Sequence, residues 1–311
     1  MKKILSIDGG GIKGVFPASF LATVEDTVGA KINDHFDLIV GTSTGGIIAL
    51  GLGMGYSAKE MLSFYEELGP KIFKGNSLFR RLRQIGFAKY DTTPLKEALT
   101  SKFGDKRLGD SFNRLVIPSV NLETGEVHVY KTSHNKRFER DYKEKVVGVA
   151  LATSAAPSYF PSHTSTTGIP LVDGGVWANN PMGLAVVEAI GVLGWDKDDI
   201  EILSIGCTSE PSNIKTARKQ SRGLAYWGVK MIDLFMSTQS FASYGTALLL
   251  LGSKNVYRFS PVVSRGRFGL DSISEIGSLK GLGDSEARKA LPSIRHFFSE
   301  KADLFIPEHK L

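Results

Sequence analysis

Cysteine is almost absent from this sequence, and long apolar runs are absent altogether. The single cysteine, Cys207, excludes an internal disulfide framework, and we expect it to be a small buried residue beside a strand. No stretch approaches the roughly 18 consecutive apolar residues of a membrane-spanning helix. The N-terminal segment reaches the charge of Asp8 too early for a signal peptide. We therefore expect a cytoplasmic protein.

The rest of the composition is that of an ordinary globular protein. The 311 residues are 42% hydrophobic and 23% charged, which is enough to bury a full core. Neither an internal repeat nor a low-complexity linker divides them, so we predict one domain over residues 1–311. The net charge of +6 favours an anionic partner, and membrane phospholipid fits this modest excess as well as nucleic acid does.

Short apolar runs that end in glycine turns alternate with helical patterns. Strands are expected at residues 4–7 and 36–40, with helices at 15–27 and after Ser43. A capping box, Ser57 with Glu60, predicts the start of a third helix. The alternation predicts a mainly parallel sheet with helices on both faces. Further strands are expected at residues 114–120, 127–130, 169–172, 200–205 and, as an edge strand, 256–259.

The second of these strands runs into a candidate nucleophile. Gly41-Thr42-Ser43-Thr44-Gly45 has the Gly-x-Ser-x-Gly form, in which a serine hydroxyl is presented on a tight turn between a strand and a helix. Gly41 and Gly45 are the glycines of this nucleophile elbow. The small and apolar residues that follow suit a buried helix packed closely against the sheet.

The glycine run after the first strand has more than one interpretation. Gly9, Gly11 and Gly14 satisfy G-x-G-x-x-G, but no acidic residue ends the second strand, as a dinucleotide site requires. A Walker loop fails because Lys13 is followed by glycine. The run also suits an oxyanion hole, whose candidate residues are Gly9, Gly10, Gly11, Ile12, Lys13 and Gly14. A turn that only tightens strand–helix packing is the remaining alternative.

A base for Ser43 is offered by Asp173, which ends an apolar run and precedes Gly174 and Gly175. A Ser-His-Asp hydrolase of the α/β type would need a histidine after this aspartate. The later histidines, His296 and His309, lie in a helical context and at the chain end. The earlier candidates occupy strand or loop settings without a distinguishing partner: His128, His134 and His163.

A direct Ser43–Asp173 dyad is therefore the simpler interpretation. An ordinary aspartate has a pKa near 3.9 and is a weak base, but burial among apolar residues would raise that pKa. The alternative for Asp173 is a turn carboxylate that caps the following segment.

Four motifs in this order resemble those of patatin-like phospholipases. They are Asp8-Gly9-Gly10-Gly11-Ile12-Lys13-Gly14, Gly41-Thr42-Ser43-Thr44-Gly45, Ala152-Thr153-Ser154-Ala155-Ala156-Pro157, and Asp173-Gly174-Gly175 followed by Asn179-Asn180-Pro181. The resemblance covers residues 4–206 clearly and continues weakly to about residue 260. We call 4–206 the motif-bearing core and 207–311 the C-terminal helical and edge-strand part.

The resemblance implies a three-layer α/β/α fold and hydrolysis of fatty acyl esters. Ser43 would be the nucleophile, Asp173 the base, and the amides around Gly10, Gly11 and Ile12 the oxyanion hole. Lys13 stands where the family commonly has arginine or lysine. The chain departs from many relatives at residues 206–208, which read Gly-Cys-Thr in place of Gly-Thr-Gly, without touching a catalytic position. We expect neither a metal nor a cofactor.

The segment from Asp8 to Leu21 also resembles the patatin-like effectors of bacterial anti-phage (CBASS) systems. That resemblance implies activation by a cyclic nucleotide from a partner cyclase, and degradation of membrane phospholipid at the inner face of the cell membrane. A DNA or RNA polymer is not an expected partner, and homo-oligomer formation stays open. No short motif marks the activator site; candidate contacts, which suit a solvated loop and a packed helix equally well, are Lys215, Arg218, Lys219, Arg222, Tyr226 and Trp227.

Two further segments are singled out by their composition. Residues 71–90 carry six basic residues and no acidic one among apolar residues, which suits either an anionic membrane surface or a helix covering the core. Residues 209–221 are rich in turn formers and predict a mobile surface loop. The leading hypothesis is a regulated phospholipase. The alternatives are a constitutive lipid acyl hydrolase and, more distantly, a non-catalytic nucleotide-binding module.

Overall fold

A mixed sheet runs through the middle of the computed structural model, which describes residues 1–73, 87–211 and 224–311, with side chains of the last range from residue 234 on. The described residues form eight strands that pair in the order β5-β6-β3-β2-β1-β7-β8, and β4 also pairs with β3. The strands are β1 (Lys2–Ile7), β2 (Leu38–Gly41), β3 (Arg114–Asn121), β4 (Val127–Lys131), β5 (His163–Thr164), β6 (Pro170–Asp173), β7 (Ile200–Ile205) and β8 (Val256–Phe259).

Both faces of this sheet are buried. Successive side chains of a strand point to opposite sides, so one strand contributes apolar residues to both faces. In β1, Leu5 and Ile7 join the larger apolar cluster, whereas Ile4 joins the smaller one. The pairs β1–β2, β1–β7, β2–β3 and β7–β8 are parallel, and β3–β4, β3–β6 and β5–β6 are antiparallel. A parallel centre with apolar residues on both faces requires helices on each side.

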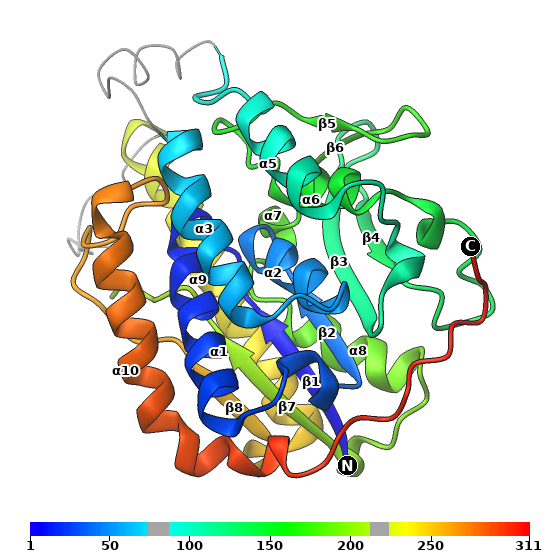
Figure 1. The fold of residues 1–311 in the computed structure, drawn as a ribbon. Coiled ribbons are helices and arrows are strands. Elements are labelled where there is room, and N and C mark those ends of the chain that lie inside the picture. The colour runs from blue at the N-terminus through cyan, green and yellow to red at the C-terminus, as the bar shows by residue number, and fades with distance from the viewer. Residues whose placement is uncertain (74–86, 212–223) are drawn as a thin grey trace.

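Helices cover the two faces and complete the three layers (Figure 1). The larger cluster contains residues from α1 (Val15–Val28), α2 (Thr44–Gly53), α3 (Ala58–Phe73), α5 (Thr93–Phe103), α6 (Val146–Ser154) and α10 (Ile276–Ile294). The smaller cluster contains residues from α8 (Met182–Gly191) and α9 (Leu224–Leu251), and the short α7 (Gly175–Ala178) packs on α9. Figure 1 shows α1, α3 and α10 side by side in front of the strands.

The predicted α/β/α architecture is confirmed, as are the predicted strands and the edge position of β8. The two-residue β5 was not predicted, because so short a strand has no periodicity to detect. Ser57 and Glu60 form the predicted capping box, and Cys207 is buried directly after β7. β8 and α10 come from the C-terminal part of the chain, yet β8 extends the central sheet and α10 packs against α1. The single domain stays a prediction.

Within residues 1–73, 87–211 and 224–311, none of the helices combines the length and the apolar composition that crossing a bilayer needs.

A buried polar cluster joins β4 to α8 and corrects one expectation. His134 was expected to have no distinguishing partner, but its Nε2 lies 2.9 Å from Glu188 Oε1, and Lys131 Nζ lies 2.6 Å from Glu188 Oε2. Burial lowers the pKa of His134, so the neutral ring donates to Glu188 and accepts from Thr132. The partners are 54 and 57 residues apart in sequence, so no local pattern could indicate the contact.

Replacing Glu188 with alanine is expected to destabilise the protein by about 3 kcal/mol, because it leaves a partly buried ammonium group and a buried imidazole N–H without their acceptor. Glu188→Gln keeps one acceptor oxygen and should lose less. Chemical denaturation of both variants checks this expectation. An alanine variant with the wild-type free energy of unfolding would show that the cluster contributes nothing to stability.

Candidate active site

The site lies where two strands meet end to end along one edge of β3. Val116 pairs with both β2 and β4, and Val120 pairs with both β4 and β6. Since a strand has only two edges, β4 occupies one of them, and β2 and β6 share the other. β2 runs parallel to β3 and β6 runs antiparallel, so their C-terminal ends point at each other. Ser43 follows one end and Asp173 forms the other.

Ser43 occupies the strained turn that the elbow motif predicted. Its φ of 54° and ψ of −120° lie outside the usual regions for a residue with a side chain. The flanking glycines permit this turn because the backbone packs against them too closely for a side chain. A Cβ on Gly41 would lie 2.2 Å from the Gly45 carbonyl oxygen, and a Cβ on Gly45 would lie 2.3 Å from that of Ile7. Only glycine fits at either position, which explains the spacing of the motif.

The hydroxyl of Ser43 donates a hydrogen bond to Asp173. The Oγ–Oδ2 distance is 2.6 Å, and both residues are buried. The other carboxylate oxygen accepts the amide of Gly175 at 2.7 Å. Burial raises the pKa of Asp173 to about 6, against the opposing effect of these two hydrogen bonds. Asp173 is therefore a much better proton acceptor than an ordinary aspartate, yet is still largely ionised at neutral pH.

The C-terminal end of α6 holds both members of this pair. Thr153 Oγ1 accepts the amide of Ser43 at 3.0 Å and donates to the carbonyl of Pro118 at 2.7 Å. The carbonyl of Ala155 accepts the amide of Asp173 at 3.0 Å. The sequence singled out this segment as a motif but gave it no role. Its role is geometric, because it fixes the backbones that carry the hydroxyl and the carboxylate.

The glycine loop lies against the same pair. A Cβ on Gly9 would lie 3.1 Å from Ser43 Cβ, and the Gly9 amide donates to the Asn179 carbonyl at 2.9 Å. Gly11 has φ +59°, and a Cβ on Gly14 would lie 2.3 Å from Thr44 Oγ1. The loop therefore needs its glycines both for its conformation and for its close packing on the elbow.

The amides of this loop differ in their partners. Ile12 donates to the carbonyl of Leu270 at 2.9 Å, and Lys13 donates to that of Gly10 at 3.2 Å. In the described part of the chain, the amides of Gly10 and Gly11 donate to no other backbone or side-chain group. Of the amides expected to form an oxyanion hole, those of Gly10 and Gly11 are the ones available for a ligand, whereas that of Ile12 already has an acceptor.

A second buried aspartate begins the glycine loop and is paired with a cation. Both carboxylate oxygens of Asp8 accept from the Arg258 guanidinium, at 3.0 and 2.5 Å, and Arg258 also donates to Ser204 at 2.7 Å. The two partners are 250 residues apart, so the sequence gave no signal for the contact. Asp8 is therefore occupied in tying β1 to the edge strand β8, and it is not available as a base.

Among the described residues, no histidine is hydrogen-bonded to Asp173. Asp173 has Ser43 and Gly175 as its described partners, and His134 is occupied by Glu188. His296 lies 3.3 Å from Glu201 at the surface, and His309 stacks on Tyr142. Within the described ranges no group of three or more histidine, cysteine, aspartate or glutamate side chains is placed to hold a metal ion.

Two of the segments singled out in the sequence fall largely outside the described residues. Of the basic stretch 71–90, residues 74–86 are not described, which removes Lys74, Arg80, Arg81 and Arg83 from consideration. Of the turn-rich stretch 209–221, residues 212–221 lie outside the description, as do the candidate activator contacts Lys215, Arg218, Lys219 and Arg222. Tyr226 and Trp227 lie in α9, but their side chains are not described.

The chain is similar to known proteins in sequence and in structure. The family described as patatin-like phospholipase matches residues 5–186. A cGAMP-activated phospholipase of Pseudomonas aeruginosa is 37% identical and covers 98% of this chain and 94% of its own. A cGAMP-activated phospholipase of Vibrio cholerae is 36% identical over 73% of this chain and 70% of its own. VipD from Legionella pneumophila aligns over 94% of this chain and 67% of its own, with 11% identity and a TM-score of 0.47.

The family match contains the glycine loop, the serine elbow and Asp173, and the relative from Pseudomonas aeruginosa extends the similarity over nearly the whole chain. The chain therefore belongs to the patatin-like phospholipases, a family of carboxylic ester hydrolases.

Proposed function

We propose that the chain hydrolyses fatty acyl esters of membrane phospholipid by a Ser43–Asp173 dyad that a cyclic dinucleotide activates. The observation that carries the dyad is the 2.6 Å hydrogen bond from the Ser43 hydroxyl to a buried carboxylate whose pKa is raised to about 6. A nucleophile in contact with a base of suitable pKa is the arrangement that acyl transfer requires.

The reaction proceeds in two balanced steps. Asp173 takes the Ser43 proton as Oγ attacks the ester carbonyl, and it then gives that proton to the leaving alcohol as the C–O bond breaks. Water next attacks the acyl-enzyme, with Asp173 accepting its proton and returning it to Ser43 as the fatty acid leaves. The same carboxylate serves as base and acid in both steps. A pKa near 6 suits both roles better than the ordinary value of aspartate.

The negative oxygen that forms at the carbonyl carbon needs hydrogen-bond donors. We assign that role to the amides of Gly10 and Gly11, which lie on the loop packed against Ser43 and have no other described acceptor. Gly9, Ile12, Lys13 and Gly14 are assigned to shaping the loop, because their amides have other partners or belong to its 3-10 turn. Gly174 and Gly175 shape the turn after the base, where the Gly175 amide holds the second carboxylate oxygen.

Control by a cyclic dinucleotide is supported by the named relatives. The relatives from Pseudomonas aeruginosa and Vibrio cholerae are both named cGAMP-activated phospholipases, and the first is similar over almost the full length of both chains. A cyclic dinucleotide is made from nucleoside triphosphates inside the cell. We therefore place the enzyme in the cytoplasm, where it would meet phospholipid at the inner face of the cell membrane.

Fatty acid release from phospholipid vesicles, measured with and without cGAMP, tests the proposal. We expect the nucleotide to raise the rate of the wild-type protein, and Ser43→Ala or Asp173→Asn to lower the stimulated rate at least about a thousandfold. Two buried residues with bonded side chains outside the site serve as matched controls. Ser19 bonds the Lys280 carbonyl and Asp37 accepts the Lys3 amide, so Ser19→Ala and Asp37→Asn should keep the activity.

Each part of the proposal can fail separately. Full activity in either dyad variant would rule out the assigned nucleophile or base. A wild-type rate that is already maximal without nucleotide would instead support the constitutive hydrolase and remove the activator.

The raised pKa of Asp173 predicts how the rate depends on pH. Because the carboxylate must be ionised to accept the Ser43 proton, kcat/KM should rise with pH through about 6 and level off above it. Hydrolysis of a soluble ester between pH 4.5 and 8 measures this. A rate that rises with a midpoint near 4 would mean that Asp173 is not desolvated.

The raised pKa of Asp173 also predicts that the folded protein loses stability as the pH rises. The pKa of Asp173 is higher in the folded protein than in the unfolded chain, so folding is penalised once the carboxylate ionises. The penalty is absent below pH 4, grows between 4 and 6, and reaches about 3 kcal/mol above 6. Asp173→Asn should therefore raise Tm at pH 7.5 but not at pH 4. An equal change in Tm at both pH values would show that ionisation of the buried carboxyl is not the cause.

A further inference from the structure

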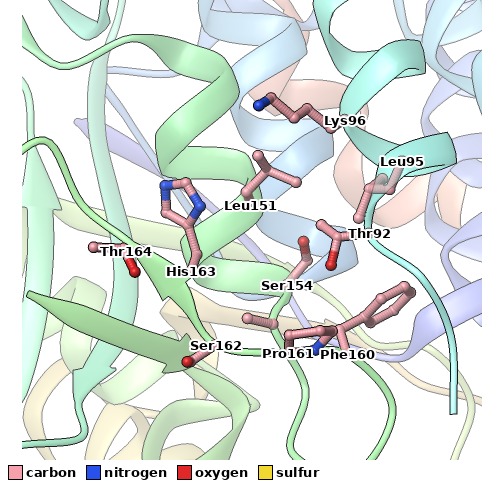
Figure 2. A pocket seen from close by; sticks show the side chains of 11 residues that line it. Thr92, Leu95, Lys96, Leu151, Ser154, Phe160, Pro161, Ser162, His163 and Thr164 are labelled. Carbon is pink, nitrogen blue, oxygen red and sulfur yellow. The ribbon is translucent and has the colours of Figure 1, made fainter. Parts of the chain in front are cut away.

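A cavity of about 220 Å³ lies beside the site, between α5, α6 and the segment that leads into β5. Figure 2 shows His163 and Thr164 on one side of it, Lys96 and Leu151 above, and Thr92, Ser154 and Phe160 on the other side. Neither the nucleophile nor the base lines it. The cavity is therefore separate from the dyad, although α6 contributes to both.

The lining of this cavity is suited to an anion with an apolar attachment. No described carboxylate lines it. Its charged or polar side chains are one lysine, one histidine and four with hydroxyl groups: Lys96, His163, Thr92, Ser154, Ser162 and Thr164. Burial and then the nearby Lys96 ammonium lower the pKa of His163, while Glu144, held by Thr166, acts in the opposite direction. The Lys96 side chain is exposed, and it forms no ion pair with a described carboxylate. Leu95, Leu151 and Phe160 supply apolar surface.

We propose that this cavity binds the phosphodiester group of a small ligand, with Lys96 as its counter-charge. A cavity of about 220 Å³ is smaller than the roughly 300–1,000 Å³ of pockets that enclose a whole drug-sized ligand. It would therefore take one phosphate with the sugar or glycerol attached to it. Two sources of this chemistry exist for the enzyme, a cyclic dinucleotide and the headgroup of a phospholipid.

The cavity is connected to the dyad through the C-terminal end of α6. Ser154 and Ala155 line it, while the neighbouring Thr153 holds the Ser43 amide and the Ala155 carbonyl holds the Asp173 amide. A ligand that shifts the end of α6 therefore changes the distance between hydroxyl and carboxylate. This inference rests on the proposed function, because it assigns the occupant an effect on that reaction.

The test compares Lys96→Glu with Lys59→Glu, which makes the same charge change at an exposed lysine of α3 outside the cavity. One arm measures cGAMP binding by calorimetry without lipid. The other measures KM for phosphatidylglycerol in mixed micelles and for the uncharged ester p-nitrophenyl butyrate. We expect Lys96→Glu to weaken one phosphodiester ligand about tenfold and to leave KM for the uncharged ester unchanged. His163→Ala, which removes the histidine of the lining, should act on the same ligand.

The outcomes distinguish a cyclic dinucleotide from a phospholipid headgroup, and failure of the cavity assignment from failure of the proposed reaction. A change confined to cGAMP affinity identifies the cavity as the activator site, and a change confined to KM for phosphatidylglycerol identifies it as a headgroup site. If neither differs from Lys59→Glu, the inference is overturned. If wild-type protein binds cGAMP through Lys96 but hydrolyses no ester, the proposed reaction fails and the cavity assignment stands.

An independent set of contacts carries a second inference, about residues 269–272, which we call the strap. The Leu270 carbonyl accepts the Ile12 amide, and a Cβ on Gly11 would lie 2.4 Å from that carbonyl oxygen. The next residue, Asp271, accepts from Lys89 Nζ and from the Tyr90 hydroxyl, each at 2.5 Å. The strap therefore lies across the glycine loop and is held there by an ion pair.

The strap also connects the loop to the base. Lys89 and Tyr90 donate their amides to the carbonyls of Ser158 and Tyr159, a few residues after the Ala155 carbonyl that holds the Asp173 amide. We infer that Asp271 is a positioning residue, which fixes the glycine loop relative to Asp173 through these contacts. It touches neither substrate nor the reacting atoms.

The test compares Asp271→Ala and Asp271→Asn on a soluble p-nitrophenyl ester and follows covalent labelling of Ser43 by a fluorophosphonate. We expect the alanine variant to lose about tenfold to a hundredfold in kcat and in labelling rate with KM within about twofold. The asparagine variant, which keeps an acceptor for Tyr90, should recover part of the rate. Asp284→Ala removes a half-exposed carboxylate of α10 that accepts from Arg288 and from Thr23, and it serves as control. An alanine variant with wild-type kcat, or one that loses only Tm, would overturn the positioning role.

Discussion

The burial of Asp173 with no cation among its described partners is the constraint on which this site depends. Two buried aspartates end strands close to the elbow, and their environments differ. Asp8 has both oxygens on the Arg258 guanidinium, whereas Asp173 has one hydroxyl and one amide as its described partners. Burial raises the pKa of both carboxyl groups, but the Arg258 guanidinium opposes the rise at Asp8, whereas no described cation opposes it at Asp173, whose pKa reaches about 6. One aspartate fastens the sheet and the other is left free to accept a proton.

The position of Ser43 carries a cost that the surrounding packing offsets. A residue held at φ 54° is strained by about 1–3 kcal/mol, and only surroundings that fix it from several directions can keep it there. Gly41 and Gly45 let the helix approach the strand, and Thr153 binds the Ser43 amide from α6. The buried α2 helix that follows has no exposed face, so the turn cannot relax without disrupting the core.

The sequence was sufficient to predict what local geometry determines. The strand ends, the elbow around Ser43 and the glycine loop follow from short patterns, because a strained turn or a close backbone approach requires glycine at fixed spacings. The contacts Asp8–Arg258, His134–Glu188 and Ile12–Leu270 could not be predicted. Each joins residues brought together only by the complete sheet, and an arginine or a carbonyl has no distinctive pattern in sequence. Asp173 was found because a base was sought for a nucleophile already identified, not because its own motif required one.

Ser43 and Asp173 lie at the ends of strands that differ in how extensively neighbouring strands pair with them. Ser43 follows β2, which lies between β1 and β3 at the parallel centre. Asp173 ends β6, which has three register pairs with β3 and on its other side only the two-residue β5. Elements with few pairings open at a lower free energy than central strands. Because β6 meets β2 end to end and not side by side, moving the base away from Ser43 would disturb the β3–β6 pairs but not the pairs that join β1, β2 and β3. The proposed control by a ligand would therefore be physically easier through Asp173 than through Ser43, and α6, which binds the Asp173 backbone, is the element through which such a ligand would act.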